Sequence, residues 1–251
     1  MGRFTGKTVL VSGAGTGLGR AAALAFAAEG AAVVLAGRTV RTLEDTLSLV
    51  EAAGGTALVV RADVGVEDDV RRAVDASVAR YGRLDVAFNN AGVLGAGPLV
   101  DLDAATVDAV LATNVRGTWL AMKYQIRQML AQGGGAIVNM SSTLGAYKVR
   151  PNTVVYGAAK AAVLALTRGA ALEHAASNIR INAVSPGAVA APMSMTDETS
   201  EQERDRRLAA LMPVGRIGSA EEVAEAVLWL ASDAASYVTG RDIVLDGGSA
   251  L

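Results

Sequence analysis

The sequence predicts an α/β fold in which helices cover both faces of a doubly wound parallel sheet of about seven strands. Short runs rich in β-branched residues alternate with longer Ala- and Leu-rich segments along the whole chain, and this alternation is typical of parallel sheets. The short runs are almost continuously apolar, as strands buried on both faces must be. No linker rich in Pro, Gly or Ser breaks the alternation, so residues 1–251 are expected to form a single domain.

The expected elements follow one another as strand, helix, strand. The apolar runs predict strands at residues 7–11, 32–36, 57–61, 85–88, 136–139, 180–184 and 242–245. The longer segments predict helices near residues 17–29, 41–53, 67–81, 104–131, 156–176 and 220–231. Residues 191–212 interrupt this rhythm with polar residues and three methionines. They are expected to form a loop and a helix outside the sheet that act as a substrate lid.

Composition excludes several classes of function. The net charge is −2, and no basic cluster or aromatic platform suggests nucleic-acid binding. The chain has no cysteine, which excludes disulfides, thiol nucleophiles and Cys-ligated zinc and suits a reducing cytoplasm. Its single histidine, His174, leaves a catalytic zinc without enough ligands. No metal is therefore expected.

The N-terminal sequence indicates no export signal. MGRFTGKTVLV reaches a strand at once, without a hydrophobic run and a small-residue cleavage site. No apolar stretch suits a membrane span. We expect a cytoplasmic protein without a membrane partner.

The turn after the first predicted strand is rich in glycine. Residues 12–19 read SGAGTGLG, and Leu18 rules out the common G-x-G-x-x-G pattern. The pattern that fits is G-x-x-x-G-x-G, on Gly13, Gly17 and Gly19. Such a turn lets backbone N–H groups at a helix N-terminus approach a pyrophosphate. A dinucleotide site is predicted here, with an empty glycine-rich turn as the alternative.

A tyrosine and a lysine stand four residues apart in VVYGAAK, in a chain with five Tyr and four Lys. Residues i and i+4 share one face of a helix, so Lys160 is expected beside Tyr156. A nearby ammonium favours the phenolate and would lower the tyrosine pKa from about 10 toward neutrality. The pair predicts a proton-transfer site, with an ordinary amphipathic helix as the alternative.

Taken together, the glycine loop and the Y-x-x-x-K pair resemble the short-chain dehydrogenase/reductase family, and the similarity covers nearly the whole chain. Further matching elements occur in the family's order: Asp63 after the third strand, the NNAG run at 89–92, Asn114 in ATNVRG, Ser141-Ser142 after the fifth strand, Pro186-Gly187 after the sixth, and LDGG at 245–248. The resemblance implies a Rossmann-like fold, a nicotinamide cofactor and oxidoreductase activity on CH–OH groups.

The resemblance also implies roles for individual residues. Tyr156 would be the general acid/base, Lys160 would also bind the nicotinamide ribose, and Ser142, favoured over Ser141 and Thr143, would hold the substrate oxygen. Asn114 would support a water chain that resupplies the proton. The implied cofactor-binding residues are Ser12, Gly13, Gly15, Thr16, Gly17, Leu18, Gly19, Arg38, Thr39, Asp63, Val64, Asn90, Ala91, Gly92, Tyr156, Lys160, Pro186, Gly187 and Val189.

The end of the second strand bears on the choice between NADP and NAD. NAD-preferring proteins of this fold place an acidic side chain there, and this chain has Gly37 at that position. Arg38 follows, and its guanidinium can bind a 2′-phosphate; Thr39 adds a hydroxyl. NADP(H) is therefore favoured, with NAD(H) as the alternative.

The predicted function is that of a carbonyl reductase or secondary alcohol dehydrogenase acting on a small ketone or alcohol. A 3-oxoacyl-carrier-protein reductase is the alternative, but residues 132–135 and 177–178 carry no charge for an acidic carrier. A silent dinucleotide-binding regulator is disfavoured by the complete catalytic set. Apolar residues expected in the substrate pocket are Leu94, Leu144, Tyr147, Val149, Met193 and Met195.

The helix expected at 156–176 bears on quaternary structure. It is small and apolar around much of its circumference, whereas a helix buried on one side only should show a cleaner polar face. Its outer face and that of the helix at 104–131 are therefore expected to pack against another subunit, in a homotetramer.

Overall fold

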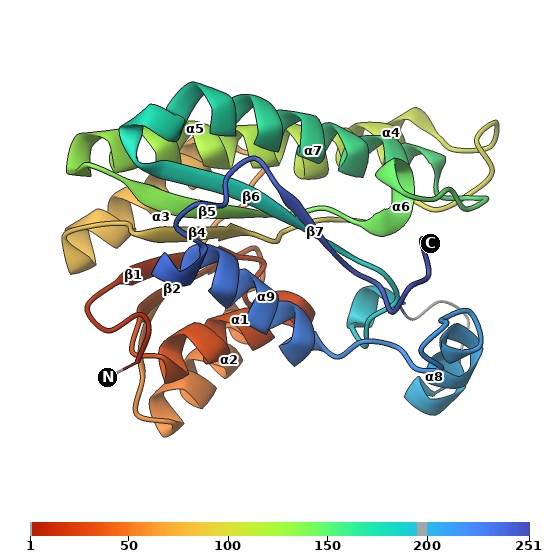
Figure 1. Cartoon of the computed structure of the whole chain (residues 1–251), viewed down its shortest axis with the longest axis horizontal. Helices are drawn as coiled ribbons and strands as arrows, with labels where there is room; N and C mark the ends of the chain where they lie inside the picture. The colour runs from red at the N-terminus through yellow and green to blue at the C-terminus, as the bar shows by residue number, and fades with distance from the viewer. Residues whose placement is uncertain (1, 195–199) are drawn as a thin grey trace.

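The computed structural model describes residues 2–194 and 200–251. Its centre is an all-parallel sheet of seven strands in the order β3-β2-β1-β4-β5-β6-β7 (Figure 1). The predicted fold class is confirmed, and the predicted strand limits are met to within one or two residues. The strands are β1 (Thr8–Ser12), β2 (Ala32–Gly37), β3 (Thr56–Arg61), β4 (Val86–Asn89), β5 (Gly135–Met140), β6 (Ile179–Pro186) and β7 (Asp242–Leu245).

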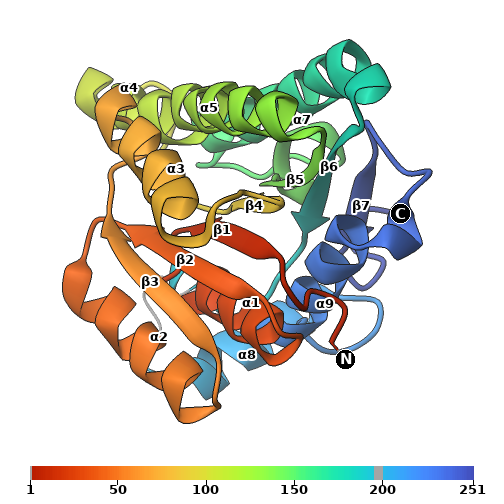
Figure 2. The same ribbon diagram turned by 90° about the vertical axis from the view of Figure 1, so that its left-hand side faces the viewer.

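Helices form a layer on each face of this sheet (Figure 2). One layer holds α1 (Gly17–Ala28), α2 (Val40–Ala52) and α9 (Ala220–Ala231), and the other holds α3 (Glu67–Tyr81), α5 (Gly117–Gln132) and α7 (Val154–His174). The shorter helical elements are α4 (Ala104–Val110), α6 (Thr143–Ala146), η2 (Ala175–Ser177), η3 (Pro192–Ser194), α8 (Glu201–Ala209) and η4 (Asp233–Ala235).

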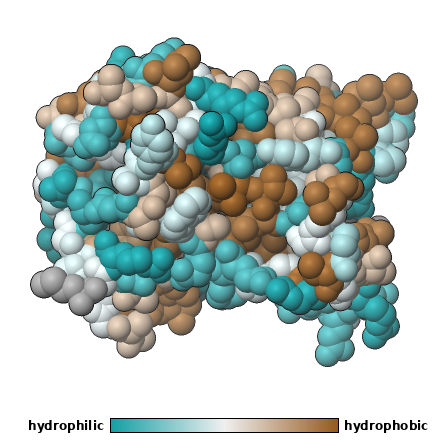
Figure 3. Space-filling model, viewed as in Figure 1, coloured by the Kyte–Doolittle hydropathy of each residue, from teal (hydrophilic) through white to brown (hydrophobic). Residues whose placement is uncertain are grey.

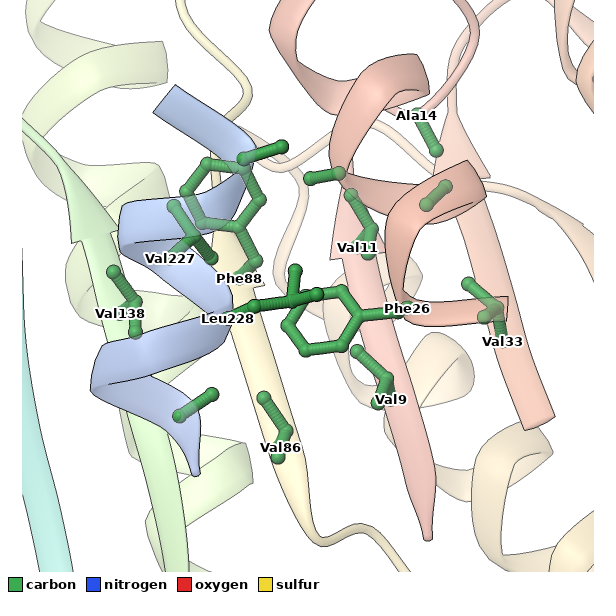
Figure 4. Packing of buried hydrophobic residues seen from close by; sticks show 14 of the residues in the cluster. Val9, Val11, Ala14, Phe26, Val33, Val86, Phe88, Val138, Val227 and Leu228 are labelled. Atoms are coloured by element: carbon green, nitrogen blue, oxygen red, sulfur yellow. The ribbon is translucent and has the colours of Figure 1, made fainter. Parts of the chain in front are cut away.

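Both helical layers bury apolar side chains against the sheet. On one face, Phe26 of α1 and Leu228 of α9 pack over Val9 and Phe88, and none of the four is exposed (Figure 4). On the other face, a second cluster built around Ile137 joins α3, α5 and α7 to the sheet. Burying a side chain of this size contributes about 1.5–3 kcal/mol. These buried clusters therefore hold the strands, and with them the carboxyl edge of the sheet, in a fixed position.

The helix predicted at 104–131 is not one helix. After α4 the chain makes a π-helical turn, η1 (Leu111–Arg116), before continuing as α5. Asn114 lies in this turn, and its buried side chain makes two hydrogen bonds to the backbone of Val93, in the loop after β4. A single widened turn hardly alters the apolar pattern, so the sequence did not reveal it.

The segment predicted to leave the sheet does so: η3 and α8 lie beyond its carboxyl edge (Figure 1). Residues 195–199 are outside the described part of the chain. The role of 191–212 as a lid stays a prediction.

One apolar helix bears on the expectation that no stretch suits a membrane span. Residues 154–177 form a helix long and apolar enough to cross a membrane by length and composition, although the sequence analysis found no such stretch. In the structure this segment is α7 with η2, and the α7 side chains of Val163, Leu164 and Ala171 are buried inside the protein. Its apolar character is explained by this packing, together with the small residues needed for close approach to β6.

Candidate active site

The site lies where the order of the strands reverses. The chain runs from β1 to β2 and β3 on one side, and then crosses to β4 on the other side of β1. Parallel sheets of this kind bind ligands at the carboxyl ends of the strands beside such a reversal. A cavity of about 580 Å³ runs along this edge, from the end of β2 past the β1–α1 turn to α7 and α8. Its volume suits a ligand of cofactor size.

The β1–α1 turn supplies a cradle of backbone. Gly17 has φ +51° and faces the cavity, and a Cβ on Gly19 would lie 2.1 Å from the Gly13 carbonyl oxygen. In the described structure no side chain caps the start of α1, and its first turn holds no acidic residue. The first N–H groups of α1, beside the cavity, are therefore free to meet an anion. These features fit the pyrophosphate of a dinucleotide.

Hydrogen bonds brace this cradle across the switch point. The Ser12 hydroxyl accepts the N–H groups of Asn90 and Ala91, each at 3.1 Å, and the Asn90 amide donates to the Ser12 carbonyl at 3.1 Å. Arg20 donates to the Gly15 carbonyl at 2.5 Å. Of the predicted cofactor residues, all line the cavity except Ser12 and Gly19. Ser12 bonds to the loop after β4, and Gly19 lies against Gly13, so both residues help to fix the turn without lining the cavity.

The catalytic candidates come from two neighbouring elements, the end of β5 and α7. Tyr156 and Lys160 lie one turn apart on α7, and both side chains are buried. The Lys160 Nζ lies 5.7 Å from the centre of the Tyr156 ring and donates to the Met140 carbonyl at 2.8 Å. Tyr156, Lys160 and Ser142 all line the cavity.

The pKa of Tyr156 departs from the expectation. Burial raises it to about 12, opposed by the hydrogen bond from Ser142. Burial also lowers the pKa of Lys160 to about 8. The predicted lowering by the ammonium is wrong: burial dominates the pKa of Tyr156, and the group that opposes it is the Ser142 hydroxyl rather than the Lys160 ammonium.

Three hydroxyl residues stand side by side at 141–143, and their bonds distinguish them. The Ser141 hydroxyl donates to the Lys160 carbonyl at 2.9 Å, and that of Thr143 donates to the Pro186 carbonyl at 3.4 Å. Ser142 Oγ accepts the Leu144 N–H at 3.1 Å and bonds to Tyr156. Of the three, Ser142 alone keeps its proton for the phenol or for a ligand.

Asn114 is close by but does not line the cavity. Its amide accepts from the Val93 N–H and donates to the Val93 carbonyl, both at 2.9 Å. The Asn114 carbonyl accepts the Thr118 hydroxyl at 2.8 Å. The side chain is therefore occupied in fixing the loop after β4, and any contribution to a water chain would have to come from its backbone.

The β2 end of the cavity carries a single cation. Arg38 and Thr39 are exposed and line the cavity, and Arg38 makes no hydrogen bond or ion pair with the described residues. Asp63 lines the wall opposite, and its carboxylate accepts the Gly65 N–H at 2.9 Å.

The part of the cavity where the sequence predicts the substrate pocket is lined differently from the prediction. Leu94, Leu144 and Met193 line the cavity, whereas Tyr147 and Val149 do not. The Tyr147 hydroxyl donates to Asp242 at 2.8 Å. Gly145 at φ +104° turns the chain here, so that Lys148 and Arg150 line the cavity instead. Met195 lies outside the described residues.

Val149 belongs to an apolar projection made by the loops before α4 and after α6. The Gly97 N–H donates to the Asn152 carbonyl at 2.9 Å and joins these loops. Leu99, Val100 and Val149 are 60, 89 and 90 % exposed, and Figure 3 shows apolar side chains gathered at this corner of the molecule. The projection stands beside the cavity mouth rather than in its wall.

No group of three or more His, Cys, Asp or Glu able to hold a metal occurs within residues 2–194 and 200–251. The groups that line the cavity include the Ser142 hydroxyl, the Tyr156 phenol and the Lys160 ammonium.

Comparisons with known proteins agree with this geometry. A family model described as enoyl-(acyl carrier protein) reductase matches residues 13–250. The cis-4-hydroxycyclohexanecarboxylate dehydrogenase of Sinomonas cyclohexanicum is 43 % identical over 98 % of this chain and 97 % of its own. The 3-oxoacyl-(acyl-carrier-protein) reductase of Thermotoga maritima is 39 % identical over 98 % of both chains. The crystal structure of levodione reductase superposes with a TM-score of 0.93, at 37 % identity and 98 % coverage of both chains.

Proposed function

The chain belongs to the short-chain dehydrogenase/reductase family of nicotinamide-dependent oxidoreductases acting on alcohol and ketone groups, and we propose that it interconverts a small cyclic secondary alcohol and its ketone. The observation that carries the proposal is the meeting of Ser142, Tyr156 and Lys160 in the wall of one cavity. The cyclic substrate of a relative 43 % identical supports the substrate class.

The residues divide the proton chemistry between them. The Ser142 hydroxyl holds the substrate oxygen, and the Tyr156 phenol exchanges a proton with it. With a pKa near 12 the phenol holds its proton at neutral pH, which equips it to protonate the oxygen formed from a ketone. For alcohol oxidation the hydrogen bond from Ser142 stabilises the phenolate. A bound nicotinamide would supply or accept the hydride.

NADP(H) is the proposed cofactor. The support is the exposed Arg38 at the end of β2, which lines the cavity, and the glycine at 37, which brings no negative charge near a 2′-phosphate. Charge-assisted contacts to phosphate are among the stronger hydrogen bonds in proteins.

A homotetramer in the cytoplasm is also proposed. The outer faces of α5 and α7 expose Trp119, Leu130, Val154 and Leu172, at 45, 46, 49 and 85 %, and such side chains favour a subunit interface. The absence of cysteine suits a reducing compartment. Light scattering at micromolar concentration measures the assembly, and a monomer would contradict this part of the proposal.

The function is tested with a panel of cyclic ketones, open-chain ketones and 3-oxoacyl thioesters, each with NADPH and NADH, followed by cofactor absorbance. Cyclic ketones are expected to show the highest kcat/KM. Turnover confined to the thioesters would instead favour a 3-oxoacyl-carrier-protein reductase, which the relative 39 % identical keeps as the second candidate.

A further inference from the structure

The substrate end of the cavity has a charge pattern that ketone reduction does not require. Lys148, Arg150 and Arg207 line this end, beyond Ser142 and Tyr156. Asp63 is the only carboxylate among the described lining residues, and it belongs to the opposite end, after β3. A neutral cyclic ketone has no charge for Lys148 or Arg150 to bind.

The fold holds Lys148 close to Ser142. The Lys148 N–H donates to the Thr143 carbonyl at 3.0 Å, and the Gly145 N–H donates to the Lys148 carbonyl at 2.8 Å. This tight turn brings the backbone of Lys148 back to the residue next to Ser142. Its position is thus fixed by hydrogen bonds rather than by a long free loop.

The side chain of Lys148 is also oriented. Its ammonium donates to the Ser249 hydroxyl at 2.6 Å, and that hydroxyl donates to Asp246 at 3.1 Å. A Cβ on Gly187 would lie 3.4 Å from Ser249 Oγ, so the ammonium stands beside the Pro186-Gly187 turn in the cavity wall. Lys148 makes no ion pair in the described part of the chain, and its charge is left for a ligand.

Arg150 lies on the same rim. Its carbonyl accepts the Thr153 hydroxyl at 2.9 Å, which ties the residue to a buried neighbour lining the cavity. Its guanidinium is exposed and bonds to none of the described residues. Lys148 and Arg150 line the same cavity, and a guanidinium and an ammonium that share a cavity wall suit a carboxylate, which can accept from both.

We propose that Lys148 and Arg150 form an anion subsite, and that the natural substrate is a small cyclic hydroxy or oxo acid whose carboxylate binds there while its ring oxygen meets Ser142 and Tyr156. This inference rests on the proposed function, since it adds a substrate group to the same site. The carboxylate belongs to a free small molecule, because residues 132–135 and 177–178 offer no charge to an acidic carrier protein.

The test compares 4-oxocyclohexanecarboxylate with its uncharged amide, using the cofactor-saturated enzyme. The wild type is expected to show a kcat/KM about ten- to a hundredfold higher for the acid, through KM, because a hydrogen bond to a charged group discriminates by that factor. Lys148→Met should remove most of this ratio, and Lys148→Arg should keep most of it. Lys7→Met is the matched control, because it removes the same charge at the amino end of β1.

Four outcomes of these measurements would overturn the subsite, the first three of them in the kinetics of the two small ketones. These are equal kcat/KM for acid and amide in the wild type, an unchanged ratio in a folded Lys148→Met, and an equal loss in Lys7→Met. Preference for a carrier-bound thioester over both small ketones would also overturn it.

A binding measurement distinguishes failure of the proposed function from failure of the anion subsite. If neither ketone is reduced, binding of cyclohexanecarboxylate is measured by calorimetry in wild type and Lys148→Met. Binding that is lost in the variant supports the subsite even so, and absent binding in the wild type overturns it.

Discussion

The two ends of the cavity are built differently. The end proposed to bind the cofactor is made of strand-to-helix turns, and hydrogen bonds join neighbouring ones, as where Asn90 after β4 bonds to Ser12 at the end of β1. The substrate end is assembled from the turn after α6, η3, α8 and the C-terminal residues, which are distant in sequence. A ligand group shared by a whole family can be bound by local backbone, whereas a particular substrate is met by side chains that separate segments bring together.

Tyr156 stands between the two ends, and its loss should have the largest effect. Tyr156→Phe is expected to lower kcat by about 10²- to 10⁴-fold, the usual range for a lost general acid. Cofactor affinity should change little, because the ring and Lys160 remain. Steady-state kinetics and cofactor titration measure both quantities.

Tyr147→Phe is the matched control, since the Tyr147 hydroxyl bonds to Asp242 and does not line the cavity. It should retain nearly normal turnover. If it lost as much as Tyr156→Phe, or if Tyr156→Phe stayed active, the assignment of the proton to Tyr156 would be wrong.

Replacing Lys160 tests whether burial of its ammonium lowers the free energy of unfolding. Burial lowers its pKa from 10.5 to about 8, so between these values the unfolded chain binds the extra proton and stability rises with pH. Below pH 8 both states are charged and the full cost, roughly 3 kcal/mol, is present. Lys160→Met is therefore expected to inactivate the enzyme yet stabilise the cofactor-free protein at pH 7.

This gain should be smaller than the full cost, because the variant loses the bond to the Met140 carbonyl. It should shrink as pH rises from 8 to 10.5. Denaturant unfolding at several pH values measures it, and a difference between variant and wild type that is constant across this range would contradict the expected titration.

Replacing Arg38 tests only the end of the cavity that is proposed to bind the cofactor, and the expected change in kcat/KM is smaller. Arg38→Ala should lower kcat/KM with NADPH by about ten- to a hundredfold, the worth of a charge-assisted contact, and leave NADH nearly unchanged. Arg41→Ala, a neighbouring charge outside the cavity lining, is the control. Wild type preferring NADH, or a variant that keeps its NADPH preference, would refute the choice of NADP(H).

Particular residues show how far prediction from the sequence extended. Tyr156 and Lys160 were placed correctly relative to each other because helical spacing fixes residues four apart. The pKa of Tyr156 was not predicted correctly, because burial depends on segments that pack against it from elsewhere in the chain. The same limit applies to the pocket: Tyr147 and Val149 were chosen by position, but the turn at Gly145 put Lys148 and Arg150 in the cavity wall.

The sequence by itself determined the order of strands and helices, the glycine turn at the first helix and the Tyr156/Lys160 pair, since apolar alternation, glycine content and i,i+4 spacing are local properties of a chain. Only the tertiary structure decided where the segment 104–131 widens around Asn114 and which charges line the cavity beyond Ser142. These features depend on hydrogen bonds between residues up to 101 positions apart, as between Lys148 and Ser249, and a local pattern carries no record of such distant partners.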